Sequence, residues 1–180
     1  MLTDKQIKRL IKQRNISVEP FDEKNVKAGK LDIHLGQFIL KPKSSTKVID
    51  PQQLNFNPEY TKYDLMKDGY ILKPGEFILG QTLELIGLDS NTGMFLDGST
   101  TMARLGLTIH QSSMFVPPGQ DPHILTLEIL NSGIWKVRLS YKLRVGKVVV
   151  FRYSENNTTD AKVFNQYNGQ KEVTGAIFRK

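Results

Sequence analysis

The chain has 180 residues, of which 39% are hydrophobic, so it is large enough to bury the core of a single globular domain spanning residues 1–180. It has no cysteine, which excludes disulfides and thiolate metal sites, and its apolar runs are far shorter than the ~20 residues of a membrane-spanning helix. The net charge of +7 favours anionic partners such as nucleic acids, phosphorylated metabolites or acidic lipids.

The first predicted element is a helix over residues 4–14. Thr3 and Gln6 have the spacing of a capping box, and apolar residues recur at helical spacing from Ile7 to Ile11. The basic residues of this segment are best interpreted as one solvated helix face, so nucleic acid is not an expected partner. The chain opens without the apolar stretch of a secretory signal, and we expect a cytoplasmic protein with no membrane partner.

Strand patterns dominate the rest of the chain. Apolar and polar residues alternate over 31–35 and again over 135–141, and Gly- and Pro-containing turn signals recur at short intervals. Many short strands with frequent turns predict a mostly β sandwich, jelly roll or small barrel. Residues 43–66 are polar and weakly patterned, which predicts an excursion from the barrel, and the composition of residues 154–180 predicts a mobile C-terminal lid.

A short polar segment follows Gly98 and offers many hydrogen-bond donors. Ser99, Thr100 and Thr101 supply three consecutive hydroxyls, and Arg104 follows three residues later. Hydroxyls, backbone N–H groups and a guanidinium can together surround phosphate oxygens. A Ser/Thr-rich turn that caps a short helical segment would have the same composition, and both interpretations remain open from these residues alone.

Glu128 is a carboxylate within an apolar strand pattern. The alternation puts Leu125, Leu127 and Ile129 on one face of the strand and Glu128 on the other. A carboxylate in such surroundings can act as a general base or acid, because burial disfavours its charge. It can equally be paired with a cation across the sheet, and Arg104 is one candidate partner.

Five collinear motifs resemble the dCTP deaminase branch of the dUTPase superfamily, and the resemblance extends over essentially the whole chain. They are Leu-Lys-Pro-Gly-Glu-Phe-Ile-Leu-Gly at 72–80, Arg-Leu-Gly-Leu-Thr-Ile-His at 104–110, Leu-Thr-Leu-Glu at 125–128, Asn-Ser-Gly at 131–133 and Tyr-Asn-Gly-Gln at 167–170. The opening Leu-Thr-Asp-Lys-Gln-Ile and Val-Glu-Pro-Phe at 18–21 also fit. This resemblance implies a distorted jelly-roll β-barrel of the dUTPase-like type, assembled as a homotrimer with active sites between subunits.

The resemblance also implies a set of site residues. Glu128 matches the general base of the family, and Arg104 matches an arginine of its catalytic site. By position, Thr100 also belongs to the catalytic residues. The substrate-binding residues implied in the same way are Ser99, Thr101, Ser113, Lys162, Tyr167 and Gln170.

The implied reaction is the hydrolytic deamination of dCTP to dUTP and ammonia. Zinc deaminases require Cys and His ligands, and this chain has no cysteine, so we expect no zinc and a metal-free attack on the base. Mg²⁺ is expected to accompany the triphosphate of the deoxynucleotide substrate.

Two positions depart from the family pattern and keep alternatives open. Ser99 stands where the family has an arginine, and Pro117 stands where it has an aspartate. The first alternative is a dUTP diphosphatase, or a bifunctional enzyme that catalyses both reactions. The second is a trimeric nucleotide-binding protein that has lost turnover.

Overall fold

The structure is a computed structural model that describes residues 1–46, 48–50, 58–155 and 165–177. It begins with helix α1 (Asp4–Lys12), and the predicted capping box between Thr3 and Gln6 is confirmed. The helix ends at Lys12, two residues before the predicted end, because Arg14 adopts a positive φ of 63°. Its apolar face buries Ile7 and Leu10 against the sheets.

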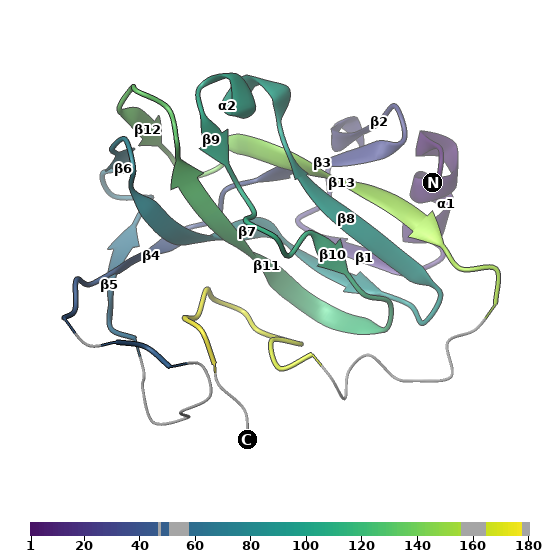
Figure 1. Cartoon of the computed structure of the whole chain (residues 1–180). Coiled ribbons are helices and arrows are strands. Elements are labelled where there is room, and N and C mark those ends of the chain that lie inside the picture. Colours follow the sequence, from purple (N-terminus) through teal and green to yellow (C-terminus); the bar gives the residue numbers. More distant parts are fainter. Residues whose placement is uncertain (47, 51–57, 156–164, 178–180) are drawn as a thin grey trace.

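The chain then forms two main antiparallel sheets, as the mostly β prediction requires (Figure 1). In the first sheet the hydrogen-bonded order is β5 (Tyr60–Asp64), β4 (Phe38–Pro42), β7 (Phe77–Leu88), β11 (Gln120–Asn131) and β9 (Leu107–Thr108), with β1 (Ile16–Glu19) also paired to β7. In the second sheet the order is β10 (Phe115–Val116), β8 (Thr92–Gly98), β13 (Arg144–Arg152), β3 (Lys30–His34) and β2 (Val26–Lys27).

Three smaller elements complete the described part. They are the two-stranded ribbon of β12 (Val137–Leu139) and β6 (Tyr70–Leu72), the short helix α2 (Thr100–Arg104) and the 3₁₀ turn η1 (Glu23–Asn25). The hydrogen bonding between these described strands does not close a barrel, so the structure is a pair of facing sheets.

Two strand predictions need correction. The expected excursion over 43–66 contains strand β5, which pairs with β4 at the edge of the first sheet. Its sequence, Tyr-Thr-Lys-Tyr-Asp, lacks apolar alternation because an edge strand with three exposed residues has no fully buried face. The strand expected over 135–141 forms only over Val137–Leu139, and Trp135 is 56% exposed outside it.

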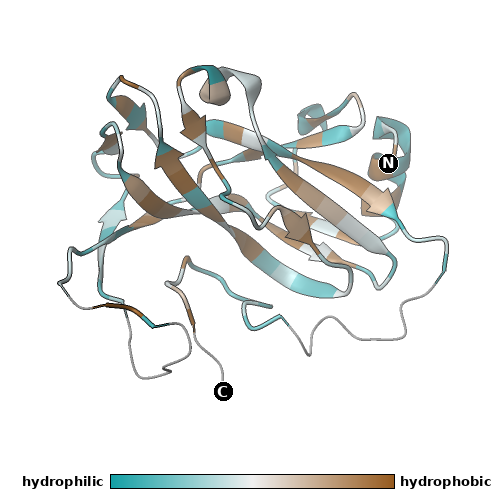
Figure 2. Ribbon diagram, viewed as in Figure 1, coloured by the Kyte–Doolittle hydropathy of each residue, from teal (hydrophilic) through white to brown (hydrophobic). Residues whose placement is uncertain are grey.

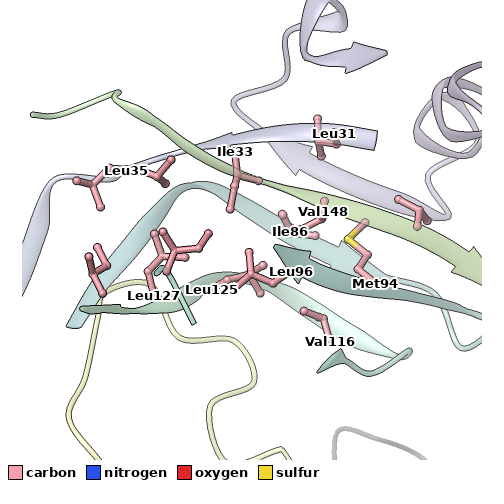
Figure 3. Packing of buried hydrophobic residues seen from close by; sticks show 14 of the residues in the cluster. Leu31, Ile33, Leu35, Ile86, Met94, Leu96, Val116, Leu125, Leu127 and Val148 are labelled. Carbon is pink, nitrogen blue, oxygen red and sulfur yellow. The ribbon is translucent and has the colours of Figure 1, made fainter. Parts of the chain in front are cut away.

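The core lies between the two main sheets. Leu31, Ile33 and Val148 of the second sheet face Leu125 and Leu127 of the first (Figure 3). Figure 2 shows the corresponding apolar residues along the strands. On β11 the residues at odd positions from 125 to 129 are buried and those between them are partly exposed, which confirms the predicted alternation and directs Glu128 out of the core.

The described part of the C-terminal segment, residues 165–177, runs beside β11 (Figure 1). The backbone N–H of Ile124 donates to the carbonyl of Gln170 at 3.1 Å, and Val173 is buried with its N–H donating to Gln81 at 3.0 Å. The segment therefore covers the outer face of β11. Across the described residues, no helix has the length and apolar character needed to cross a membrane.

Candidate active site

A cavity of about 950 Å³ lies against the outer face of β11. Its floor comes from β11, including Thr126 and Glu128, one wall comes from residues 111–118, and the C-terminal segment closes another side. Apolar side chains such as Leu79 and Leu96 make up much of the lining. An apolar cavity with few polar groups is typical of a small-molecule site.

Glu128 is held in this cavity by one backbone group. Its carboxylate Oε2 accepts a hydrogen bond of 2.8 Å from the backbone N–H of Gln111. Its own backbone N–H donates to the carbonyl of Ile109 at 2.9 Å. Within the described residues, no Lys or Arg forms an ion pair with Glu128, so the cross-sheet pairing with Arg104 does not form in this chain.

Three other residues that the sequence singled out also line the cavity: Ser113, Tyr167 and Gln170. Tyr167 Oη accepts a hydrogen bond of 3.1 Å from the backbone N–H of Ile177. Gln170 Nε2 donates to Thr126 Oγ1 at 2.8 Å, two residues from Glu128 on the same face of β11. The structure thus brings the Tyr-Asn-Gly-Gln motif and the Leu-Thr-Leu-Glu motif to one site.

The hydroxyl segment lies outside the cavity lining. Ser99 is the N-cap of α2, with Oγ accepting from the N–H of Met102 at 3.2 Å, which is the helix-capping arrangement considered above. Thr100, Thr101 and Arg104 are exposed on α2 and do not line the cavity of the same chain. Lys162 lies outside the described residues.

The cavity lacks positive charge because α2, which carries Arg104, lies outside its lining. Among the described residues that line it there is no Lys or Arg, and Glu128 is the only carboxylate. A nucleoside triphosphate carries several negative charges, which the described residues of one chain do not neutralise in this cavity.

His123 is a cavity residue that sequence reasoning missed. It is only 4% exposed, and burial lowers its pKa from 6.5, although its hydrogen bond to the backbone of Asp121 acts in the opposite direction. Nδ1 donates to the carbonyl of Asp121 at 2.7 Å. The available signal was its place in the Gln-Asp-Pro-His segment, five residues before Glu128 on the same strand, β11.

Gln111 was missed as well, and it provides the N–H that binds Glu128. No polarity pattern marks this residue, because it follows the last residues of a strand and its main contribution comes from the backbone.

A family profile described as dCTP deaminase-like matches residues 1–153, which is most of the chain. The chain belongs to this family. A relative from Leifsonia xyli subsp. xyli, named dCTP deaminase, dUMP-forming, is 30% identical over 182 residues and covers 98% of this chain and 89% of its own. A relative of the same name from Nanoarchaeum equitans is 30% identical over 193 residues, covering 98% of this chain and 96% of its own.

A solved structure supports the fold of this family member. The crystal structure of 2′-deoxycytidine 5′-triphosphate deaminase from Agrobacterium tumefaciens has a TM-score of 0.65 and 17% sequence identity. The match covers 84% of this chain and 48% of the other, so this chain spans about half of that protein. The similarity establishes the dUTPase-like fold that the sequence motifs implied.

Proposed function

We propose that this protein deaminates dCTP, with Glu128 as the general base. The observation that carries the proposal is the position of Glu128, in the floor of a cavity of about 950 Å³, with no cation paired to it among the described residues. The names of the relatives, dCTP deaminase, agree with this reaction.

The proposed chemistry needs one proton acceptor and one cavity for the base. Glu128 takes a proton from a water molecule, which attacks C4 of the cytosine ring. The resulting tetrahedral intermediate then collapses with loss of the C4 amino group. That group leaves as ammonia after receiving the proton held by Glu128, and the remaining proton of the attacking water moves from the C4 hydroxyl to N3, so that the ring becomes uracil. The absence of cysteine from the sequence supports an attack without zinc.

We further propose that a second copy of the chain supplies the charge that the cavity lacks. Arg104 is exposed at the end of α2 and has no ion pair among the described residues, so its guanidinium is available to a triphosphate bound in a neighbouring cavity. The hydroxyls of Thr100 and Thr101 lie on the same short helix. A homotrimer with sites between subunits would bring these residues to Glu128, and Mg²⁺ would enter as the counter-ion of the triphosphate.

The C-terminal segment is the proposed lid. Tyr167 and Gln170 line the cavity from this segment, and Ser113 lines it from the wall made by residues 111–118. Closing the segment over a bound nucleotide would exclude bulk water from the reaction. Lys162, Tyr167 and Gln170 are the proposed contacts of this lid with the substrate, with Ser113 and Ser99 contributing from the rest of the chain.

A second candidate product is dUMP, because the relatives are named dUMP-forming. In that case the enzyme would also hydrolyse the bond between the α- and β-phosphates and release pyrophosphate. Pro117 lines the cavity and has no side-chain donor or acceptor, so it contributes nothing to the activation of water for that step.

One assay separates these candidates. The purified protein is incubated with dCTP and Mg²⁺, and with dUTP and Mg²⁺, and ammonia, dUTP, dUMP and pyrophosphate are measured. The proposal expects ammonia and dUTP from dCTP, whereas ammonia with dUMP and pyrophosphate identifies the bifunctional enzyme. Pyrophosphate and dUMP from dUTP alone identify a diphosphatase. Nucleotide binding without any product identifies a protein that has lost turnover.

A further inference from the structure

We infer that Gln111 is a positioning residue that fixes the Glu128 carboxylate for proton transfer, an inference that rests on the proposed function of Glu128. Three hydrogen bonds of Gln111 support it: two join Gln111 to the side chain and the backbone of Glu128, and the third joins the Gln111 side chain to Thr108.

The bond from the Gln111 N–H to the Glu128 carboxylate continues the pairing between β9 and β11. Strand β9 pairs with the end of β11 through Leu130 and Thr108, and the N–H of Glu128 then donates to the carbonyl of Ile109 at 2.9 Å. At Gln111 the ladder ends, and its backbone N–H donates to Oε2 of Glu128 at 2.8 Å. The Gln111 N–H thus binds the Glu128 carboxylate instead of the backbone carbonyl that it would bind in a continued strand.

The Gln111 side chain ties this N–H in place. Nε2 donates to Thr108 Oγ1 at 2.9 Å and to the backbone carbonyl of Glu128 at 3.3 Å. Gln111 is exposed and lies where the chain leaves the sheet, so its backbone would otherwise lack strand partners. The amide therefore couples the N–H that binds the carboxylate to both β9 and β11.

This arrangement leaves the two carboxylate oxygens of Glu128 in different states. Oε2 is held by Gln111, whereas Oε1 has no hydrogen-bond partner among the described residues, and the side chain lines the cavity. A carboxylate that acts as a general base needs one oxygen free for the proton, and a hydrogen bond to the other oxygen fixes the distance between the free oxygen and the attacking water. Gln111 supplies that hydrogen bond.

The inference predicts a selective effect of Gln111→Ala. Loss of the two side-chain bonds should lower kcat for dCTP deamination by about 10- to 100-fold, because a misplaced reacting group costs rates of that order. KM should stay within about threefold of the wild type, because the inferred role of the Gln111 side chain is to hold Glu128 rather than to bind the substrate.

Substitutions of Thr108 test the anchor separately. Thr108→Val removes the hydroxyl that Gln111 Nε2 binds and should lower kcat in the same direction, whereas Thr108→Ser keeps the hydroxyl and should keep the activity. The double variant Gln111→Ala with Thr108→Val should be no slower than Gln111→Ala alone, because both changes remove the same bond. Gln37→Ala is the matched control: its Nε2 binds Asp64 Oδ2 at 3.1 Å, away from the cavity lining, and kcat should be unchanged.

An NMR measurement separates this inference from the proposed function. In the wild type the backbone amide of Gln111 should exchange slowly with solvent, and in Gln111→Ala the amide at position 111 should exchange at least about tenfold faster. An active wild type with an equally active Gln111→Ala variant overturns the inference. If the wild type does not deaminate dCTP, the proposed function fails, and the role of Gln111 in proton transfer fails with it. The exchange data then decide only whether the Gln111 side chain holds the N–H on Glu128: unchanged exchange in the variant overturns that contact as well.

Discussion

Two carboxylates on different sheets have opposite surroundings. Asp32 on β3 is 1% exposed and binds three cations, Lys27 and Arg144 at 3.2 Å each and Lys30. Glu128 on β11 is partly exposed, faces a cavity and binds the backbone N–H of Gln111. No Lys or Arg reaches Glu128 among the described residues.

The difference distinguishes a carboxylate that serves the fold from one available for chemistry. Burial of Asp32 opposes its negative charge, but the hydrogen bonds from Lys30, Lys27 and Arg144 outweigh this and lower its pKa. Asp32 therefore stays charged and its oxygens are occupied. Glu128 has one oxygen without a partner in the described structure, which a proton acceptor requires.

The largest expected effect comes from Glu128→Gln. This variant keeps the size and the acceptor for the N–H of Gln111 but cannot take a proton, so dCTP deamination should fall by about 10²- to 10⁴-fold. The free energy of unfolding should change by less than about 1 kcal/mol. Ammonia release and urea unfolding measure the two quantities. Near wild-type turnover in this variant would remove Glu128 from the mechanism.

Asp32 binds cations of its own chain, whereas the Glu128 cavity is proposed to receive Arg104 from a second copy. Arg104→Ala tests this proposal. Loss of a charge-assisted hydrogen bond should raise KM for dCTP by about 10- to 100-fold. Coexpression with Glu128→Gln should restore activity at about a quarter of the sites, those that combine an intact Glu128 with an intact Arg104. If the mixed sample is no more active than the sum of the two variants, both residues act within one chain or Arg104 acts elsewhere.

Asp32→Ala should reduce stability rather than chemistry. Removing the carboxylate leaves partly buried cations without their partner, and we expect a loss of about 1–3 kcal/mol in the free energy of unfolding. Asp97→Ala is the matched control: Asp97 pairs with Lys147, but its side chain is 53% exposed, and the expected loss is below about 1 kcal/mol. Equal losses of the free energy of unfolding in the two variants would show that the burial of Asp32 does not make its ion pairs more stabilising than the exposed pair of Asp97.

The smallest expected effect concerns His123 in the Glu128 cavity. Because burial lowers the pKa of His123 in the folded state, the unfolded chain takes up a proton first as the pH falls below about 6.5. Stability should therefore decrease as the pH falls from 7 to 5, and this decrease should be smaller in His123→Gln. Urea unfolding at both pH values measures it, and an identical pH dependence in the two proteins would contradict the assignment.

The sequence predicted those features that depend on local patterns. The capping box at Thr3 and the alternation around Glu128 were correct, because each is set by residues only a few positions apart. Collinear motifs indicated the family, and the family profile agrees. The polar strand β5 was missed, since edge pairing with β4 depends on a partner strand rather than on a pattern in its own residues.

The residues of the candidate site can also be separated into those selected from the sequence and those found only in the structure. Glu128 stood out by its place in an apolar strand, and the family resemblance selected Ser113, Tyr167 and Gln170. The structure places all four along one cavity, and their roles stay predictions. Only the tertiary structure brought the C-terminal segment onto β11, assigned Gln111 to the Glu128 carboxylate and separated α2 from the cavity. These contacts join residues far apart in the chain through hydrogen bonds between backbone and side-chain groups, and such pairings leave no periodic signal in the sequence.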